Sequence, residues 1–172
     1  MGYALIGLAA GTADGVQGVL VYMAIYVAMT LGAFACIIAM RRPDGAVERI
    51  SDLAGLARTK PAMAIFLAMM MFSLAGVPPL AGFFAKFYVF LAAIKAGLFG
   101  LAVIGVVTSV IGAYYYLMIV KIMYFDEPAP GFVPMRPELR VVLGVTGLFV
   151  MLFGFYPGPL VDAAAVAAKS LF

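Results

Sequence analysis

The sequence of 172 residues contains a single cysteine, Cys36, and no histidine. Disulfide scaffolds, haem sites and metal sites built from histidine and cysteine therefore have almost no ligands available. One cysteine cannot hold an iron–sulfur cluster, and the sequence has neither a Gly-x-Gly-x-x-Gly turn nor a phosphate loop ending in Gly-Lys-Ser/Thr. We therefore expect any redox cofactor or nucleotide to bind on other chains.

Charged residues are also scarce, at 11% of the sequence, whereas hydrophobic residues make up 66% and the mean hydropathy is +1.15. Soluble domains have roughly 25% charged and 45–50% apolar residues, so this composition indicates an integral membrane chain. The net charge of +3 comes from loops in which lysine and arginine alternate with acidic residues. No basic helix face appears, so no nucleic-acid partner is expected.

The distribution of apolar residues predicts an all-α, polytopic transmembrane helical bundle that forms a single membrane domain over 1–172. A crossing needs about 20 apolar residues, and the stretch 16–40 has 25 residues without a charge. The stretch before it is too short to span and resembles the tail of a helix whose beginning is missing. The predicted parts are a partial helix at 1–11, transmembrane helices at 16–40, 98–125 and 139–156, a broken transmembrane helix at 61–97, cytoplasmic loops at 41–60 and 126–138, and a terminal helix or tail at 160–172.

The stretch 61–97 is interrupted in its middle, from Gly76 to Pro79. Pro78 and Pro79 remove backbone donors and clash with the preceding turn, while Gly82 allows the chain to resume a helix. Each half has only about 15 residues, or roughly 22 Å, against a hydrocarbon core of roughly 30 Å. We therefore predict one crossing made of two half-helices, with a hairpin of two short crossings as the alternative.

The predicted loops also indicate the orientation of the chain. The segments 41–60 and 121–140 hold eight of the eleven lysine and arginine residues, while Lys95 and Lys169 lie on the opposite side. Loops rich in these residues stay on the cytoplasmic side of the membrane. Within 41–60, apolar residues fall near helical spacing, so this segment is either a short amphipathic helix on the membrane surface or an ordinary connecting loop.

Lys86 is the residue around which we interpret the function. A charged lysine near the middle of the membrane costs at least about 2.5–3.5 kcal/mol, and Lys86 lies nine residues, or roughly 13 Å, from Lys95 at the far interface. A proton carrier is the favoured interpretation, and a snorkelling or structural lysine is the alternative. The apolar spans contain no aspartate or glutamate, so a partner carboxylate has to come from elsewhere.

Other polar side chains within the predicted spans could line a hydrated path. These candidates are Tyr22, Tyr26, Thr30, Thr108, Tyr115 and Lys121. Tyr22, Tyr26 and Thr30 recur every four residues and share one helical stripe, which interhelical packing explains better than a path does. Lys121 lies near the end of its span, where a snorkelling lysine is the simpler interpretation.

The run SLAGVPPLAGFFAKFYV at 73–89 and the later YYYL at 114–117 closely resemble the antiporter-like N-subunit family (subunit 2 in mitochondria) of proton-pumping NADH:quinone oxidoreductase, respiratory complex I. In the sister M subunits a glutamate stands at the position of Lys86, and in the L subunits an acidic residue follows the lysine. Here Phe87 follows, as in the N subunits. The resemblance implies that Lys86 is a proton-relay residue in the broken helix.

The resemblance covers nearly the whole chain and implies the C-terminal part of an antiporter-like fold. It also implies a non-redox subunit of a bacterial inner-membrane translocase that lies among neighbouring antiporter-like subunits and membrane lipids. NADH, FMN, iron–sulfur clusters and quinone would then be bound by partner subunits. Two other functions remain open, namely a cation/proton antiporter outside respiration and a membrane subunit that only braces an assembly.

Overall fold

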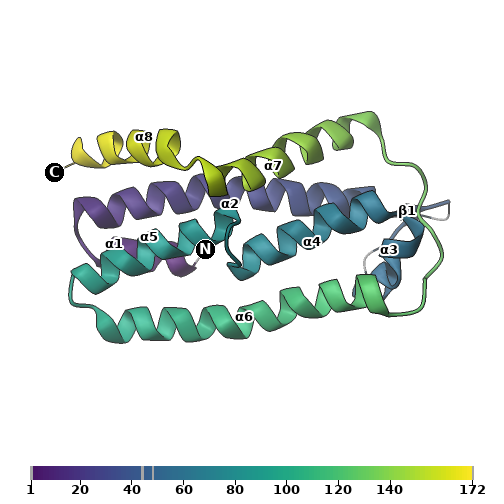
Figure 1. The fold of residues 1–172 in the computed structure, drawn as a ribbon, viewed down its shortest axis with the longest axis horizontal. Coiled ribbons are helices and arrows are strands. Elements are labelled where there is room, and N and C mark those ends of the chain that lie inside the picture. Colours follow the sequence, from purple (N-terminus) through teal and green to yellow (C-terminus); the bar gives the residue numbers. More distant parts are fainter. Residues whose placement is uncertain (1, 44, 48, 172) are drawn as a thin grey trace.

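The helix α2, Ala13–Ala39, is the element around which the other helices pack, with α1, α4, α5, α7 and α8 all in contact with it. The computed structural model describes residues 2–43, 45–47 and 49–171. Met1, Asp44, Glu48 and Phe172 lie outside the described residues, so the predicted start of the partial helix and the last residue of the tail lie there too. The predicted all-α bundle is confirmed (Figure 1).

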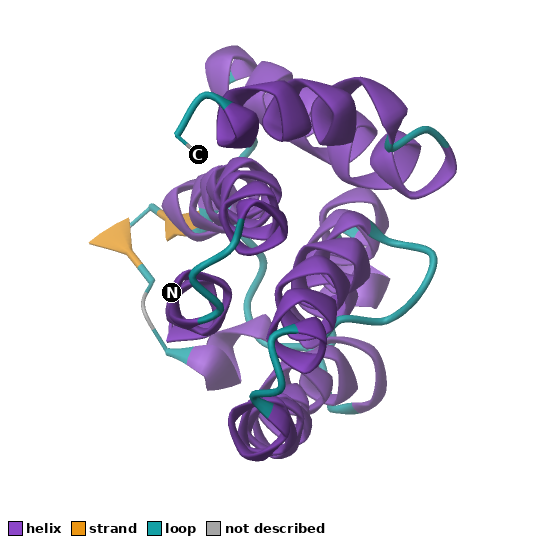
Figure 2. Ribbon diagram, turned by 90° about the vertical axis from the view of Figure 1, so that its left-hand side faces the viewer, coloured by secondary structure: helices purple, strands orange, loops and turns teal. Residues whose placement is uncertain are grey.

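The other helices are α1, which precedes α2 in the sequence, and α3 to α8, which follow it. Their bounds are α1 Gly2–Ala9, α3 Leu56–Thr59, α4 Pro61–Ala75, α5 Ala81–Lys95, α6 Phe99–Phe125, α7 Pro137–Phe155 and α8 Gly158–Lys169. Among the described residues, α2, α6 and α7 are each long and apolar enough to cross a membrane. Figure 2 looks nearly along the helices, so their axes run roughly parallel.

The segment between α3 and α6 is a discontinuous helix. The helices α4 and α5 have 15 residues each and follow one another along the bundle, so that together they run beside α6 (Figure 1). Since α4 begins at the end of the bundle where α2 ends, and α6 begins at the opposite end, α4 and α5 make one traverse. The predicted break is confirmed, and the hairpin of two short crossings is not formed.

The two loops predicted to be cytoplasmic meet at one end of the bundle. Backbone hydrogen bonds join Val133 N to Arg41 O at 2.8 Å and Ala129 N to Ala54 O at 3.0 Å. Within 41–60 the chain forms a short antiparallel hairpin, β1 Arg41–Arg42 with β2 Gly45–Ala46, then the 3₁₀ turn η1 Ile50–Leu53 and α3. No continuous amphipathic helix forms among the described residues of this segment, because Gly55 has a φ of +61° and interrupts the helical spacing.

The contact between α2 and α5 places the second half-helix in the core. Ala81, Ala85 and Val89 recur every four residues on α5 and are fully buried, as are Val21 and Ile25 on α2. Small side chains at such a seam let two helix backbones approach closely. The tight packing on this face of α5 fixes the direction in which its other side chains point, including Lys86.

Candidate functional site

The site is built at the C-terminal end of α4, where the helix stops at a left-handed glycine. Gly76 has a φ of +93°, a conformation that residues with a Cβ rarely adopt. Its amide donates to the Phe72 carbonyl at 3.1 Å, and the Val77 amide donates to the same carbonyl at 3.0 Å. The last carbonyls of a helix have no partners within the helix. The carbonyls of Leu74 and Ala75 therefore need a donor from elsewhere.

Lys86 supplies that donor. Its Nζ atom donates to Leu74 O at 2.9 Å, to Ala75 O at 2.9 Å and to Ser109 Oγ on α6 at 2.8 Å. Helical side chains lean towards the N-terminus of their own helix, which here is the break. The Lys86 side chain therefore points back to the break, away from the interface at Lys95, and does not snorkel in that direction.

Two glycines let the break close around this lysine. A Cβ at Gly76 would lie 3.2 Å from Lys86 Nζ, so a side chain there would crowd the ammonium. A Cβ at Gly82 would overlap the Ser73 carbonyl, and the Gly82 amide donates to Ser73 Oγ at 3.0 Å. The start of α5 can thus lie directly against the end of α4, which brings Lys86 within reach of the α4 carbonyls.

A cavity of about 320 Å³ opens beside the ammonium between α5 and α6. Its lining residues are Ala75, Gly76, Phe83, Lys86, Phe87, Phe90, Val106, Ser109, Val110 and Ala113. A liquid water molecule occupies about 30 Å³, so this space admits several. On the side of the ammonium nearest α1, the ring of Tyr3 lies 5.4 Å from Lys86 Nζ, within the range of a cation–π contact.

No carboxylate of a described residue forms an ion pair with Lys86. The negative charge facing the ammonium is the partial charge at the C-terminal end of α4, equivalent to about half an elementary charge. Two of the carbonyls that carry this partial charge, Leu74 O and Ala75 O, accept the hydrogen bonds from Nζ. Within the described chain the site therefore offers the amine dipoles and no carboxylate.

Among the predicted lining residues, Tyr22 and Tyr26 connect to the site through Tyr3. The Tyr3 and Tyr22 rings meet edge to face with centroids 6.5 Å apart, and the Tyr22 and Tyr26 rings stack at 5.8 Å. Tyr22 is buried and Tyr26 is partly buried. Thr30, two turns beyond Tyr22, is partly buried too, and the stripe continues away from Lys86 along α2.

Three of the predicted lining residues lie away from Lys86 in the described chain. Thr108 is exposed, and its hydroxyl donates to Gly105 O on its own helix at 2.9 Å. The Tyr115 side chain is 65% exposed, and the neighbouring Tyr116 packs against the core in its place. Lys121 forms an ion pair with Asp126 at 3.3 Å where α6 ends. Adjacent residues on a helix point about 100° apart, so Ser109 contacts Lys86 where Thr108 does not, and Tyr116 packs against the core where Tyr115 is exposed.

Ser109 and Tyr3 belong to the site and were missing from the predicted set. Thr108 and Ser109 are adjacent in the same apolar span, so the sequence alone does not show which of the two hydroxyls faces Lys86. Antiparallel pairing of α5 and α6 about the short turn at 96–98 would have placed a residue near 109 beside Lys86. No periodicity in the short α1 marks Tyr3, since α1 has only eight residues.

A helical bundle with a discontinuous helix, and with an intramembrane lysine that caps the break, defines an antiporter-like membrane protein. The description "NADH:quinone oxidoreductase/Mrp antiporter, TM" belongs to the family that matches residues 1–112. The chain belongs to this family. That match includes the whole break, Lys86 and Ser109.

Curated relatives carry the name NADH-quinone oxidoreductase subunit N. The chain is 67% identical over 172 residues to the protein of Methylobacterium nodulans and 69% identical over 172 residues to that of Azorhizobium caulinodans. In both cases the match covers 100% of this chain and 36% of the relative, so the chain spans about a third of their length.

Solved structures resemble the fold. A chain of respiratory complex I from Thermus thermophilus with bound aureothin matches with a TM-score of 0.80 and 32% identity, over 95% of this chain and 37% of that one. A chain of the Mrp complex from Dietzia sp. matches with a TM-score of 0.86 at 23% identity, over 99% of this chain and 40% of that one. The second likeness concerns the fold alone.

Proposed function

We propose that this chain is part of a membrane subunit of NADH:quinone oxidoreductase that contributes to proton translocation coupled to quinone reduction, with Lys86 as the intramembrane relay. The observation that carries the proposal is the contact of Lys86 Nζ with Leu74 O, Ala75 O and Ser109 Oγ. An amine held this way lies inside the bundle, beside a cavity, and away from the interfaces where an incidental lysine would snorkel. The names of the relatives supply the identity of the reaction.

The three partners of Lys86 suit both of its protonation states. An ammonium has three donors and no acceptor, which matches two carbonyls and the hydroxyl oxygen of Ser109. A neutral amine keeps two donors for Leu74 O and Ala75 O and gains a lone pair, which Ser109 can meet by turning its O–H towards it. The proton can therefore leave or return without stranding a buried polar atom, and the break itself stays in place.

A relay needs a group that takes the proton and one that supplies it. The cavity beside Lys86 has room for water that would reach the amine on one side, and the Tyr3–Tyr22–Tyr26 cluster lies on another. A carboxylate or second amine from another part of the subunit, or from a neighbouring antiporter-like subunit, would bias Lys86 towards or away from its charged form. A change of charge at that carboxylate or amine would therefore drive proton uptake or release at Lys86.

The same proposal places the chemistry of electron transfer on other chains. The chain would have no catalytic redox site, and NADH, FMN, iron–sulfur clusters and quinone would be bound by partner subunits of complex I. Its surroundings would be the bacterial inner membrane, other membrane subunits and phospholipid. The lysine- and arginine-rich loops at 41–60 and 121–140 would face the cytoplasm.

The test uses the full-length subunit in its assembled complex, reconstituted in liposomes. NADH and a quinone are added to the liposomes. Acidification of the liposome interior and oxidation of NADH are then followed for the unmodified complex and for Lys86→Ala. We expect acidification that depends on NADH and falls sharply in the variant. Proton movement driven by a sodium gradient without NADH oxidation would favour a cation/proton antiporter. Unchanged acidification in an assembled Lys86→Ala complex would favour a subunit that only braces the membrane arm.

A further inference from the structure

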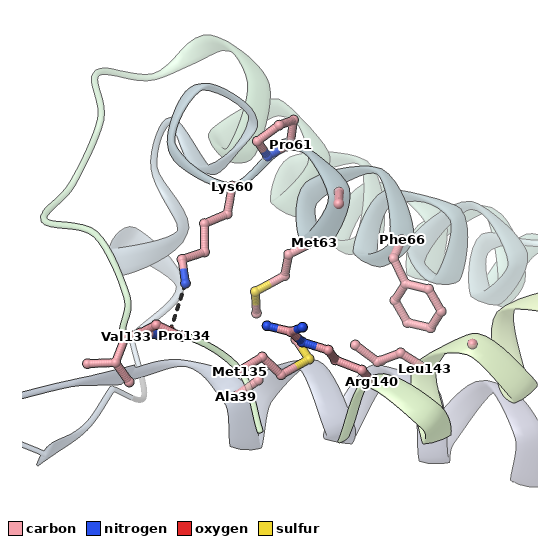
Figure 3. Close-up of a pocket in the computed structure, with 12 residues that line it drawn as sticks. Ala39, Lys60, Pro61, Met63, Phe66, Val133, Pro134, Met135, Arg140 and Leu143 are labelled. Carbon is pink, nitrogen blue, oxygen red and sulfur yellow. Dashed lines mark hydrogen bonds between the residues drawn. The ribbon is translucent and has the colours of Figure 1, made fainter. Parts of the chain in front are cut away.

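A second hollow lies at the other end of α4, on the loop-bearing end of the bundle and far from the break. It is a cavity of about 570 Å³ between the start of α4 and the start of α7 (Figure 3). Its lining residues are Ala39, Lys60, Pro61, Ala62, Met63, Phe66, Val133, Pro134, Met135, Arg140, Leu143 and Gly144. We call it the α4–α7 groove, and neither the relay nor its surrounding tyrosines contribute to it.

The deep part of the α4–α7 groove is apolar. Met63 and Phe66 line it from α4, and Leu143 lines it from α7 (Figure 3). Phe66 lies six residues, or about 9 Å, along the helix from Lys60, so the groove runs from the helix ends into the depth of the hydrocarbon layer. A space of this shape and composition suits a hydrocarbon chain.

The rim of the groove is basic. Lys60 donates to Val133 O at 2.7 Å, which uses one of its three N–H donors. Arg140 lines the groove as well, and in the view of Figure 3 its guanidinium lies between the side chains of Met63 and Met135. None of the ion pairs among the described residues involves Lys60 or Arg140. Two cations thus face the same opening without a described counter-ion.

The basic character continues into an adjoining hollow of about 500 Å³ that shares Ala39 and the segment 133–135 with the groove. Arg41, Arg42 and Arg136 line this hollow, and of these Arg42 is paired with Asp52 at 3.0 Å. Glu138 is the acidic residue among the described residues that line either space. The combined surface therefore carries an excess of positive charge at the depth of the headgroups.

We infer that the α4–α7 groove binds an anionic phospholipid, with its phosphate at Lys60 and Arg140 and one acyl chain along Met63, Phe66 and Leu143. The occupant has to bring both an anion at the rim and hydrocarbon below it, and a phospholipid with net negative charge does both. Basic pockets between transmembrane helices on the cytoplasmic side are suited to such headgroups. An apolar helix of another subunit would fill the depth and leave the two cations without an anion.

Two kinds of variant test the two halves of this site separately. Arg140→Gln removes the charge at the rim. Gly144→Leu fills the acyl slot, because no atom lies within 4 Å of a Cβ built at Gly144 and the added side chain therefore has room. Matched controls are Arg58→Gln, an exposed cation at the same end paired with Glu127, and Gly112→Leu on α6, which has equally open space.

The whole complex is purified in detergent and exchanged with mixed micelles of phosphatidylglycerol and phosphatidylcholine. It is then delipidated in steps, and native mass spectrometry counts the lipid molecules that each complex retains. We expect Arg140→Gln and Gly144→Leu each to lose a tightly held phosphatidylglycerol that the unmodified complex and both controls retain. NADH-driven electron transfer stays as the check that each complex has assembled. Equal retention of phosphatidylglycerol in all complexes would contradict the proposed lipid site. Retention of phosphatidylcholine instead of phosphatidylglycerol by the unmodified complex would contradict it too. Cross-linking of Gly144→Cys to another subunit, through a thiol-attached photoreactive reagent, would also contradict it by placing protein in the groove.

Discussion

Lys86 Nζ and Ser109 Oγ lie 2.8 Å apart, although the two residues are 23 positions apart in sequence and belong to different helices. This contact is one that joins the discontinuous helix to α6, and it borders the cavity beside the amine. The hydroxyl is the partner of Lys86 that can change from acceptor to donor, since the other two partners are backbone carbonyls.

Replacing Ser109 therefore separates relay function from folding. Ser109→Ala removes a hydrogen bond to the amine of Lys86, worth about 1.5–3 kcal/mol when the amine is charged, and it removes the one partner that can also donate to the neutral amine. NADH-driven acidification in liposomes should fall while the complex assembles normally. Ser109→Thr keeps the hydroxyl and should retain most of the activity. Equal acidification by the alanine and threonine variants would remove Ser109 from the relay.

Gly76 tests whether the end of α4 must remain open to the lysine. Gly76→Ala introduces strain at a φ of +93°, about 1–2 kcal/mol, and also brings a Cβ to 3.2 Å from Lys86 Nζ. Gly97→Ala is the matched control, because Gly97 has a φ of +77° but open space around it. We expect both variants to lower the thermal stability of the complex, and only Gly76→Ala to reduce protons moved per NADH oxidised. A similar loss of coupling in both would assign the effect to backbone strain alone.

Gly82 controls the approach of the two half-helices. A Cβ at Gly82 overlaps the Ser73 carbonyl, so Gly82→Ala has to push α5 away from α4. Overpacking of this kind costs typically 1–3 kcal/mol, and here it also breaks the bond from Gly82 N to Ser73 Oγ. We expect a low yield of assembled complex on native gels. Gly100→Ala, with nothing near its Cβ, should assemble normally, and a normal yield for Gly82→Ala would contradict the packing described for the break.

Tyr3 tests the cation–π contact. Tyr3→Phe keeps the ring beside Lys86 Nζ and removes the hydroxyl, whereas Tyr3→Leu removes the ring and a contact worth about 0.5–2 kcal/mol. If the ring is what holds the ammonium, acidification should be near normal in the phenylalanine variant and reduced in the leucine variant. A loss in both variants of similar size would point to the hydroxyl, and hence to proton transfer through the tyrosine cluster.

The bundle and its break were predictable because their causes are local. Pro78 and Pro79 cannot continue the helix that precedes them, and two halves of 15 residues are too short to cross separately. The segment 41–60 was harder to predict, because the spacing of its apolar residues is compatible with a helix. The left-handed conformation of Gly55 interrupts that helix. Tertiary contacts with the loop at 126–136 then determine its path.

The site was predictable only in part, for a geometric reason. Sequence identified Lys86 because a lone lysine in an apolar span is costly, and that argument needs no partner. Its partners are two backbone carbonyls, which no sequence pattern marks, and a serine whose selection over Thr108 depends on how far α6 is rotated about its axis. The same rotation decides between Tyr115 and Tyr116.

The most direct measurement of the central claim is the number of protons moved per NADH oxidised by the assembled complex in liposomes, for Lys86→Ala against Lys95→Ala. Lys95 lies on the same half-helix but pairs with Asp14 at the exposed end, 2.7 Å away. If Lys86 relays protons, the ratio falls in Lys86→Ala and stays unchanged in Lys95→Ala. A ratio equal to that of the unmodified complex in both variants would contradict the proposed role of Lys86.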